Sequence, residues 1–303
     1  MPNTIKSSFH VVLFATDLSD RSSAALRYAA SAAAAYGAKL FLVHVIDPDI
    51  TPTDSSPSDL RDLAQSATSE LKGICQSLLA THGMAGEAIV RYGNVRDVIF
   101  QVQQECSADI VVLGSSGKKI GSNNTLGSTA EAILRSMPCN VLTIGPHSEW
   151  HPFSTKEQAV LVPTDLSADS LAALPTAISM ATSLSASLLL LHVCDPYELH
   201  SCFEREADCR EKLQKVAASV KNQSLQVAYF LEDGRIAQQV LSFAKEKNVG
   251  LIVMAIHQGN LDDGTRLHGT VSDIVRESHC PVLTVAHHVA APISVAQSQV
   301  TLK

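Results

Sequence analysis

The sequence predicts an α/β protein built from two tandem units, each an open five-stranded parallel sheet with helices on both faces. Short apolar runs typical of strands alternate with longer stretches typical of helices. The runs are continuously apolar, as expected for strands that are buried on both faces of a parallel sheet. Strands separated by helices imply right-handed crossovers between parallel neighbours. The same order of elements occurs twice, which predicts two units of one fold.

Local patterns place the elements of the first unit in order. A strand over 11–16 is followed by a helix over 17–37, with the capping residues Asp17 and Ser19 at its start, an alanine-rich body and a glycine at its end. The remaining elements alternate in type: strand 39–46, helix 58–82, strand 87–92, helix 94–105, strand 109–114, helix 127–137 and strand 140–145.

An internal duplication accounts for the second unit. Residues 12–48 align without a gap with residues 160–196, an offset of 148 residues, and about half of the positions are identical. A later match pairs Gly127 with Gly269, an offset of 142 residues. The period is too long for a solenoid repeat. A chain of 303 residues is also long enough for about two domains.

The duplication sets the expected domain boundaries. We expect one domain at 8–146 and a second at 158–287, joined by a polar linker at 147–157. The tail at 288–303 has no counterpart in the first unit and is expected to be disordered.

Composition excludes several classes of protein. The formal net charge is −7 and the basic residues are scattered, which argues against a nucleic-acid partner. No run approaches the roughly 20 apolar residues that span a bilayer, and the first residues lack the apolar core of a signal peptide. We therefore expect a cytoplasmic protein with no membrane partner. Its seven cysteines are expected to be reduced thiols.

The loop over 113–129, "LGSSGKKIGSNNTLGST", is the strongest candidate for a binding site. It holds four glycines, four serines, two threonines and two lysines directly after an apolar strand. Gly114 and Gly117 would let the backbone approach a ligand closely. Gly127 stands at a helix start, where free N–H groups attract anions and Ser128 and Thr129 add hydroxyl donors. A phosphate group is the natural ligand.

Asp17 completes this candidate site if the first and fourth strands are neighbours. Ligands of open α/β sheets bind beyond the carboxyl ends of strands, at the point where strand order reverses. Asp17 ends the first strand and Gly114 ends the fourth, so the site would lie between them. The carboxylate could then accept hydrogen bonds from a ribose or a base.

Common enzyme motifs do not fit. The loop is not a Walker A motif, because Lys118 and Lys119 come too early, and we expect both lysines on a solvated face. No G-x-S-x-G or H-E-x-x-H pattern is present. The sequence therefore predicts no catalytic residues, and slow ATP hydrolysis is the most that an enzyme interpretation allows.

Both units resemble the universal stress protein family. The family pattern is Gly, two residues, Gly, nine residues, Gly and then Ser or Thr, and Gly114, Gly117, Gly127 and Ser128 match it fully. The "TD" after the first strand, the "HV" after the second and the "CPVL"-like last strand match as well. The resemblance covers roughly 8–146 and 158–287 and implies a Rossmann-like fold of the adenine nucleotide alpha hydrolase type.

The resemblance also implies a ligand and a partner. It implies that an adenine nucleotide, ATP or else AMP or ADP, binds with Mg²⁺ or Mn²⁺. The residues that would hold it are Asp17, Val45, Gly114, Gly117, Gly127, Ser128 and Thr129. Single-domain members look like homodimers that pair through the last strand, so the two units here would form an intramolecular pseudo-dimer. A homodimer of whole chains and an unknown protein partner stay open.

The second unit keeps only part of this pattern. Asp165, Val193, Gly259, Gly269 and Thr270 match and define a weaker second site. Departures lie in the same loop: Ala255 replaces the first glycine, one extra residue precedes the second glycine, and Asp262 and Asp263 would repel phosphate. We expect one nucleotide per chain, bound by the first unit as part of a stress-response regulatory or interaction module.

A structural alternative exists for each site residue. Asp17 and Asp165 could serve only to cap the following helices, and the glycines could be plain turn residues. His44 and His192 end strands and are expected to be hydrogen-bonded structural residues. On these grounds the chain could be an interaction scaffold that binds no nucleotide.

A different small ligand or a metal in the second unit is a further alternative. Cys194, His200, Cys202 and Cys209 cluster in sequence there, and such side chains suit zinc. The spacing lacks a C-x-x-C pair, which favours plain thiols.

Overall fold

The computed structural model describes residues 9–48, 57–116, 126–152, 158–194, 202–220, 225–257 and 269–287. Up to residue 144 it forms a first half with strands and helices in strict alternation. Their bounds are β1 (Val11–Thr16), α1 (Asp20–Tyr36), β2 (Lys39–Ile46), α2 (Pro57–His82), β3 (Gly86–Tyr92), α3 (Val95–Cys106), β4 (Ile110–Gly114), α4 (Ser128–Ser136) and β5 (Asn140–Ile144).

The second half repeats this order with one helix divided in two. Its elements are β6 (Ala159–Pro163), α5 (Ala168–Leu171), α6 (Leu174–Leu184), β7 (Leu188–Cys194), α7 (Cys202–Val220), β8 (Val227–Asp233), α8 (Ile236–Glu246), β9 (Val249–His257), α9 (Gly269–Glu277) and β10 (Val282–His287).

A proline marks the place where the helix divides. Pro175 stands in the first turn of α6, at the position that Arg27 holds inside the continuous helix α1. Proline lacks a backbone N–H and its ring clashes with the preceding turn, so it is tolerated only near a helix start. The duplication predicted one continuous helix after the first strand of each half. The second half instead has two shorter helices, α5 and α6.

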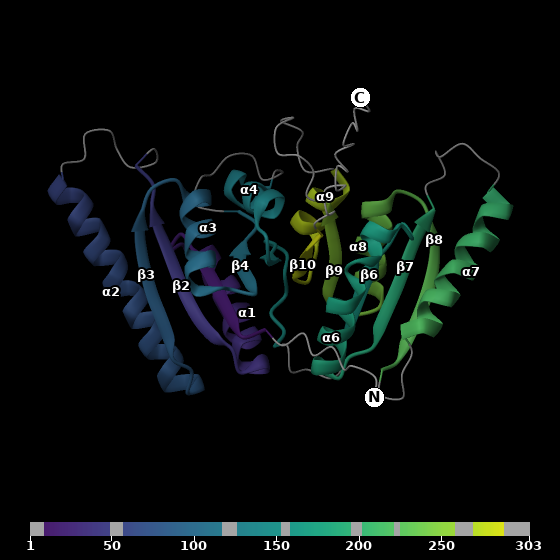
Figure 1. Cartoon of the computed structure of the whole chain (residues 1–303), viewed down its shortest axis with the longest axis horizontal. Coiled ribbons are helices and arrows are strands. Elements are labelled where there is room, and N and C mark those ends of the chain that lie inside the picture. Colours follow the sequence, from purple (N-terminus) through teal and green to yellow (C-terminus); the bar gives the residue numbers. More distant parts are fainter. Residues whose placement is uncertain are drawn as a thin grey trace, which may run out of the picture.

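The ten strands of the described residues form one open sheet, in the order β3-β2-β1-β4-β5-β10-β9-β6-β7-β8. Within each half the neighbouring strands are parallel. The predicted fold class is confirmed: each half contributes five parallel strands with helices on both faces, and pairing of β5 with β10 joins the two predicted sheets into one. Figure 1 shows the first half in purple to teal and the second half in green to yellow, joined along β5 and β10.

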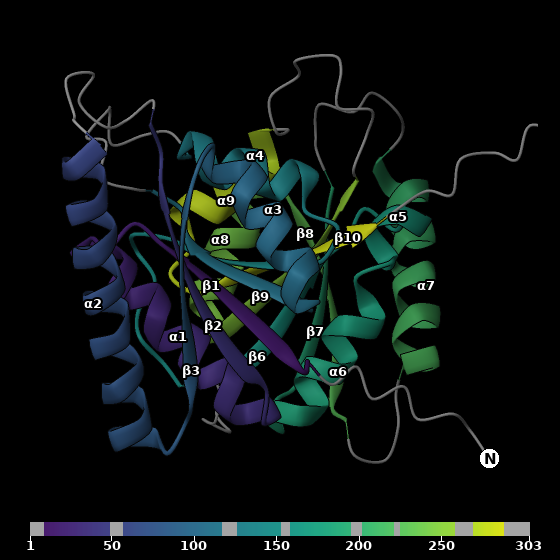
Figure 2. The same ribbon diagram turned by 60° about the vertical axis from the view of Figure 1, so that its left-hand side comes forward.

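The helices of each half lie on both faces of the sheet. Buried residues of α1, α2, α6 and α7 share one core cluster, and those of α3, α4, α8 and α9 share the other. In both ribbon views α2 runs along the outer strand β3 (Figures 1 and 2). The strands between these layers are almost wholly apolar, which is the reason for their continuous hydrophobic runs.

The two halves join through an antiparallel pair of strands. Leu142 of β5 stands opposite Leu283 of β10, while Val141 faces Thr284 and Thr143 faces Val282. Leu142 and Leu283 are equivalent residues of the two halves, 141 positions apart, so a pseudo-twofold axis passes between them. The predicted pairing of the halves through their last strands is confirmed, and it leaves neither strand as an open sheet edge.

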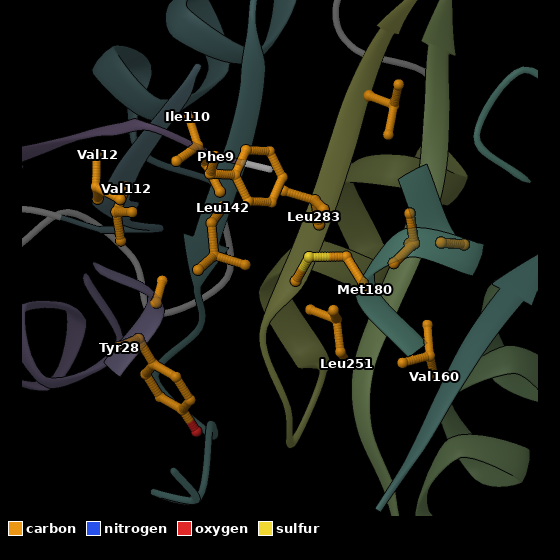
Figure 3. Packing of buried hydrophobic residues seen from close by; sticks show 14 of the residues in the cluster. Phe9, Val12, Tyr28, Ile110, Val112, Leu142, Val160, Met180, Leu251 and Leu283 are labelled. Atoms are coloured by element: carbon orange, nitrogen blue, oxygen red, sulfur yellow. The ribbon is translucent and has the colours of Figure 1, made fainter. Parts of the chain in front are cut away.

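The core is continuous across this seam. Leu142 and Leu283 are 1% and 0% exposed and belong to the same buried cluster. Figure 3 shows the two side chains on either side of the seam. Tyr36 of α1 extends the contact, because its ring stacks edge-on with Phe9 at 5.0 Å and its hydroxyl contacts the sulfur of Met180 in α6. Burying the Tyr36 phenol raises its pKa to about 12.

The segment after β5 makes hydrogen bonds and a ring contact with residues of both halves. The hydroxyl of Tyr28 donates to the carbonyl of Glu149, and the Tyr28 ring stacks edge-on with Trp150 at 4.8 Å. The N–H of Glu149 donates to the carbonyl of His279, in the turn before β10. Burial raises the pKa of Tyr28 to about 12. The tail at 288–303 lies outside the described residues.

Candidate functional site

The order of the strands creates a switch point between β1 and β4. From β1 the chain moves outward to β2 and β3, then crosses back to place β4 on the other side of β1. Phe14 of β1 stands beside Val112 of β4, two residues before Thr16 and Gly114. The carboxyl ends of the two strands therefore meet at one edge, which is where ligands of such sheets bind. The first and fourth strands are therefore neighbours, as a site between Asp17 and Gly114 requires.

Asp17 occupies a tight turn between β1 and α1. Its Oδ1 accepts hydrogen bonds from the N–H of Ser19 at 3.0 Å and from the Ser19 hydroxyl at 2.6 Å. Ser19 is the N-cap, and its hydroxyl accepts from the N–H of Ser22. The helix begins at Asp20, three residues later than the sequence suggested. Asp17 thus supports the cap without being the capping residue.

His44 holds the end of β1 in place. Its Nδ1 lies 2.9 Å from the carbonyl oxygen of Thr16, and His192 repeats this contact with Thr164 at 2.8 Å. Since the carbonyl can only accept, the Nδ1 atom carries the proton. Both histidines are hydrogen-bonded structural residues, as predicted. The next residue, Val45, is half-buried and packs on the core beneath α3 and α4.

Gly114 has no structural reason of its own to be glycine. Among the described residues, a Cβ at this position would meet the carbonyl oxygen of Ser116 alone, at an ordinary contact distance of 3.6 Å. Its φ does not fall in the left-handed region that favours glycine. The described part of the chain therefore does not itself require glycine at position 114.

Gly127 marks the amino end of α4. It adopts an extended conformation with φ −61° and ψ 139°, which any residue can reach, and no side chain caps the helix there. Its N–H donates to the carbonyl of Ser115, whose own N–H donates to Ile144 of β5. The first turn of α4 thus stands beside the carboxyl ends of β4 and β5. A helix amino end with no side-chain cap is suited to an anion.

Several predicted residues fall outside the described part of the chain. Gly117 and Gly259 are among them, as are Lys118, Lys119, His200, Asp262 and Asp263. Of the sequence cluster proposed for zinc, Cys194 and Cys209 are half-buried and neither forms a disulfide in the described part of the chain. Among the described residues, no group of three side chains could hold a metal ion.

The second half repeats the turn but not the glycines. The N–H of Ser167 donates to Oδ1 of Asp165 at 2.9 Å, as its counterpart does at Asp17. Burial opposes ionisation of Asp165, but hydrogen bonds from Ser167 and Ser170 outweigh it and lower the pKa of the carboxyl. Ala255 stands opposite Val285 of β10, as Gly114 stands opposite Ile144 of β5, so Ala255 replaces Gly114.

Helix α9 of the second half aligns with α4 of the first half one position away from the predicted alignment. From α4 and α9 onward, equivalent positions are 141 residues apart, since α4 begins at Ser128 and α9 at Gly269. The earlier pairing of Gly269 with Gly127, at 142 residues, is wrong by one position. Gly269 corresponds to Ser128, and Thr270 corresponds to Thr129. The sequence has His268 at the position equivalent to Gly127.

Sequence reasoning missed the polar network behind Asp17. The hydroxyl of Thr16 accepts from the N–H of Leu18 at 3.0 Å and contacts the hydroxyl of Ser22 at 2.9 Å. The sequence did contain a signal for this network. The stretch Thr-Asp-Leu-Ser occurs in both units, and in each unit a second serine follows three residues after the first. From sequence alone, a serine in the first turn of a helix is interpreted as a capping residue. Its contact with a strand residue cannot be predicted in this way, because that contact depends on the tertiary structure.

Comparison with known proteins agrees with this architecture. The sequence profile of the universal stress protein family matches residues 8–145 and again residues 157–286. The chain belongs to the universal stress protein family. Two matches in one chain make it a tandem member, as the sequence predicted.

Two relatives of this family each cover about one half of the chain. Universal stress protein A homolog 1 of Coxiella burnetii is 32% identical over 136 residues, which is 44% of this chain and 94% of that protein. Universal stress protein G of Salmonella typhimurium is 29% identical over 138 residues, 44% of this chain and 94% of that protein. These curated relatives are about the length of one half.

A solved universal stress protein matches both halves together. The crystal structure of a universal stress protein from Archaeoglobus fulgidus superposes with a TM-score of 0.71 at 21% identity, covering 91% of this chain and 98% of that chain. At this identity the likeness shows the fold alone. Within the described residues, none of the helices has both the length and the apolar character needed to cross a bilayer.

Proposed function

We propose that this universal stress protein binds one adenine nucleotide per chain, ATP with Mg²⁺ or Mn²⁺, in its first half. The site lies at the carboxyl edge between β1 and β4, and its residues are Asp17, Val45, Gly114, Gly117, Gly127, Ser128 and Thr129. Binding would stabilise a surface that another protein reads, as part of a stress-response regulatory module. The division into domains at 8–146 and 158–287 belongs to this proposal.

The observation that carries the proposal is the glycine at position 114. Neither its backbone conformation nor the described residues around it require glycine, yet it stands at the switch point opposite Asp17. A glycine that the fold does not need is explained if a ligand passes over its backbone at close range. The second half has alanine at the equivalent position, which fits the loss of the ligand there.

A polyphosphate fits the other end of the site. The first turn of α4 points its N–H groups outward beyond Gly127, and Ser128 is exposed there with Thr129 half-buried beside it. These groups donate hydrogen bonds and the helix dipole favours negative charge. A divalent metal would arrive with the triphosphate, because Mg²⁺ is held mainly by phosphate oxygens and water rather than by protein cages.

The nucleoside fits the side of the site formed by β1 and β2. The Asp17 carboxylate can accept hydrogen bonds from ribose hydroxyls or from the base, and its position is fixed by Ser19. Val45 offers an apolar surface one residue beyond the His44 contact. A carboxylate beside the sugar and N–H groups beside the phosphates would be complementary to a nucleotide in charge.

The weaker second site would involve Asp165, Val193, Gly259, Gly269 and Thr270. Ala255 at the first glycine position and His268 at the position equivalent to Gly127 support one nucleotide per chain rather than two. We infer no catalytic role for either site, with slow ATP hydrolysis at most. We propose the cytoplasm as the site of action.

Calorimetric titration of MgATP into the full chain tests the proposal. We expect a stoichiometry near one, lost in Asp17→Ala and retained in the matched variant Asp165→Ala. A stoichiometry of two would show that the second half binds as well. No binding by the unmodified chain would reject the proposal.

An interaction scaffold without nucleotide is the alternative function. The observation that favours it is the seam, because the antiparallel pairing of β5 with β10 already forms a complete pseudo-dimer within one chain. Absence of nucleotide binding together with stable association to a protein partner would support it. Analytical ultracentrifugation would show whether whole chains pair further into a homodimer.

A further inference from the structure

Leu18 and Leu166 have a backbone conformation that leucine rarely adopts. Their φ angles are +58° and +65°, in the left-handed region. Among the described residues, the other non-glycine residues with positive φ are Ser107, Ser185 and Asn248. These three follow helices, where a left-handed residue is the usual way to end a helix. The two leucines instead precede helices, so helix termination does not explain them.

Left-handed backbone is unfavourable for leucine because its Cβ comes too close to the following carbonyl oxygen. Such strain persists only where the surrounding structure enforces it. Glycine would adopt the same φ without strain. The presence of leucine at this turn therefore indicates that its side chain contributes something that glycine cannot.

The side chain of Leu18 anchors the turn. It is half-buried and packs against the core cluster on the α1 face of the sheet. The N–H of Leu18 donates to the hydroxyl of Thr16 at 3.0 Å, and that hydroxyl contacts Ser22 of α1. The turn is thus held from the strand, from the helix and from the core at once.

This turn sets the position of Asp17. The reversal of the chain at Leu18 brings Ser19 back towards the end of β1, where its N–H and its hydroxyl both donate to Asp17 Oδ1. The distances of 3.0 and 2.6 Å leave the carboxylate little rotational freedom. If φ at Leu18 moved to the common right-handed or extended region, Ser19 would turn away and the carboxylate would lose both donors.

We propose that Leu18 is a positioning residue of the nucleotide site: its anchored left-handed backbone holds the Asp17 carboxylate at the switch point between β1 and β4. The inference rests on the proposed function, because a position matters for binding only if Asp17 contacts the ligand. Leu18 itself touches no ligand and acts through Asp17.

A pair of substitutions separates the anchor from the backbone conformation. Leu18→Ala removes the anchor and keeps the strain, so the turn leaves the left-handed region for much of the time. Leu18→Gly removes the anchor and the strain together. Affinity falls in proportion to the fraction of molecules with the competent turn. We expect MgATP affinity to fall by about tenfold or more in Leu18→Ala and to recover by about threefold or more in Leu18→Gly relative to Leu18→Ala.

The second half supplies the matched control. Leu166 has the same conformation, and its N–H donates to the hydroxyl of Thr164 at 2.9 Å. Leu166→Ala and Leu166→Gly should change the melting temperature as the Leu18 variants do. They should leave MgATP affinity unchanged, because the nucleotide is bound by the first half.

The outcomes are distinguishable. The order of affinities wild type, Leu18→Gly, Leu18→Ala, with unchanged affinity in both Leu166 variants, supports the positioning role. Wild-type affinity in both Leu18 variants, at altered melting temperature, overturns it and leaves the proposed function standing. No MgATP binding by the wild-type chain overturns the proposed function and this inference with it.

Discussion

The hydroxyl oxygens of Thr16 and Ser22 lie 2.9 Å apart, and those of Thr164 and Ser170 repeat the contact at 2.8 Å. Each pair joins the end of a strand to the first turn of the next helix. The pairs are equally well formed in the half that keeps the glycine pattern and in the half that has lost it. The turn after the first strand is therefore part of the fold, whereas the glycine loop varies independently of it.

Gly114→Ala separates binding from stability. Among the described residues, the added Cβ would meet only one ordinary contact at 3.6 Å, and removing a glycine reduces the freedom of the unfolded chain. We expect the free energy of unfolding to stay the same or rise by about 0.4–1 kcal/mol. MgATP affinity should fall by about tenfold or more, because the methyl group occupies the ligand's approach.

Calorimetry and urea denaturation of the same Gly114→Ala protein measure the two effects. Ala255→Gly is the control and should leave MgATP affinity unchanged. Full MgATP affinity in Gly114→Ala would contradict a ligand contact at Gly114 and would favour the interaction scaffold.

Leu142→Ala tests the seam between the halves. Leu142 is 1% exposed and faces Leu283, so truncation leaves a cavity in a core that both halves share. Buried leucine-to-alanine substitutions cost about 2–5 kcal/mol. We expect a loss of this size in urea denaturation, with fluorescence and circular dichroism reporting one coincident transition in the unmodified chain. Two separate transitions in the unmodified chain would show that the halves are stable without each other.

Ser19→Ala tests the cap of α1. The Ser19 hydroxyl accepts from the N–H of Ser22 and donates to Asp17, and capping serines contribute about 1 kcal/mol. We expect the free energy of unfolding to fall by about this amount. Ser23→Ala, at an exposed position on the same helix, should change it by less than about 0.5 kcal/mol. Equal effects of the two substitutions would argue against Ser19 as the cap.

His279 makes stability depend on pH. Burial lowers its pKa below the ordinary value of 6.5, and Lys245 and His151 add to this, while Glu149 and a backbone hydrogen bond with Val249 oppose it. The unfolded chain then binds the proton more tightly than the folded chain. Its contribution is fully present above about pH 6.5 and is lost as the pH falls towards the folded-state pKa.

Urea denaturation at a series of pH values between 7.5 and 5 measures this dependence. His279→Gln should flatten the decline below pH 6.5 relative to the unmodified chain. An unaltered slope in His279→Gln would assign the decline to other groups.

The candidate site was partly readable from sequence and partly not. Asp17, Gly114 and Gly127 were identified from type and spacing, and the first two do meet at neighbouring strand ends. The sequence analysis paired Gly127 with Gly269, whereas the equivalent residue of the second half is His268. The error arose because Gly269, one position further on, also gave an acceptable alignment. Only the paired strands and the helix starts reveal which residues are equivalent.

The amino-acid sequence by itself determined the fold class, the duplication and the family, because continuous apolar runs, helix starts and a repeated motif are local properties of a chain. The tertiary structure decided what depends on partners distant in sequence. It determined the ten-stranded sheet across Leu142 and Leu283, the hydroxyl contact of Thr16 with Ser22, and the left-handed turn at Leu18. A strained backbone angle has no local signal, because the same residues would avoid it in isolation and accept it only when packing enforces it.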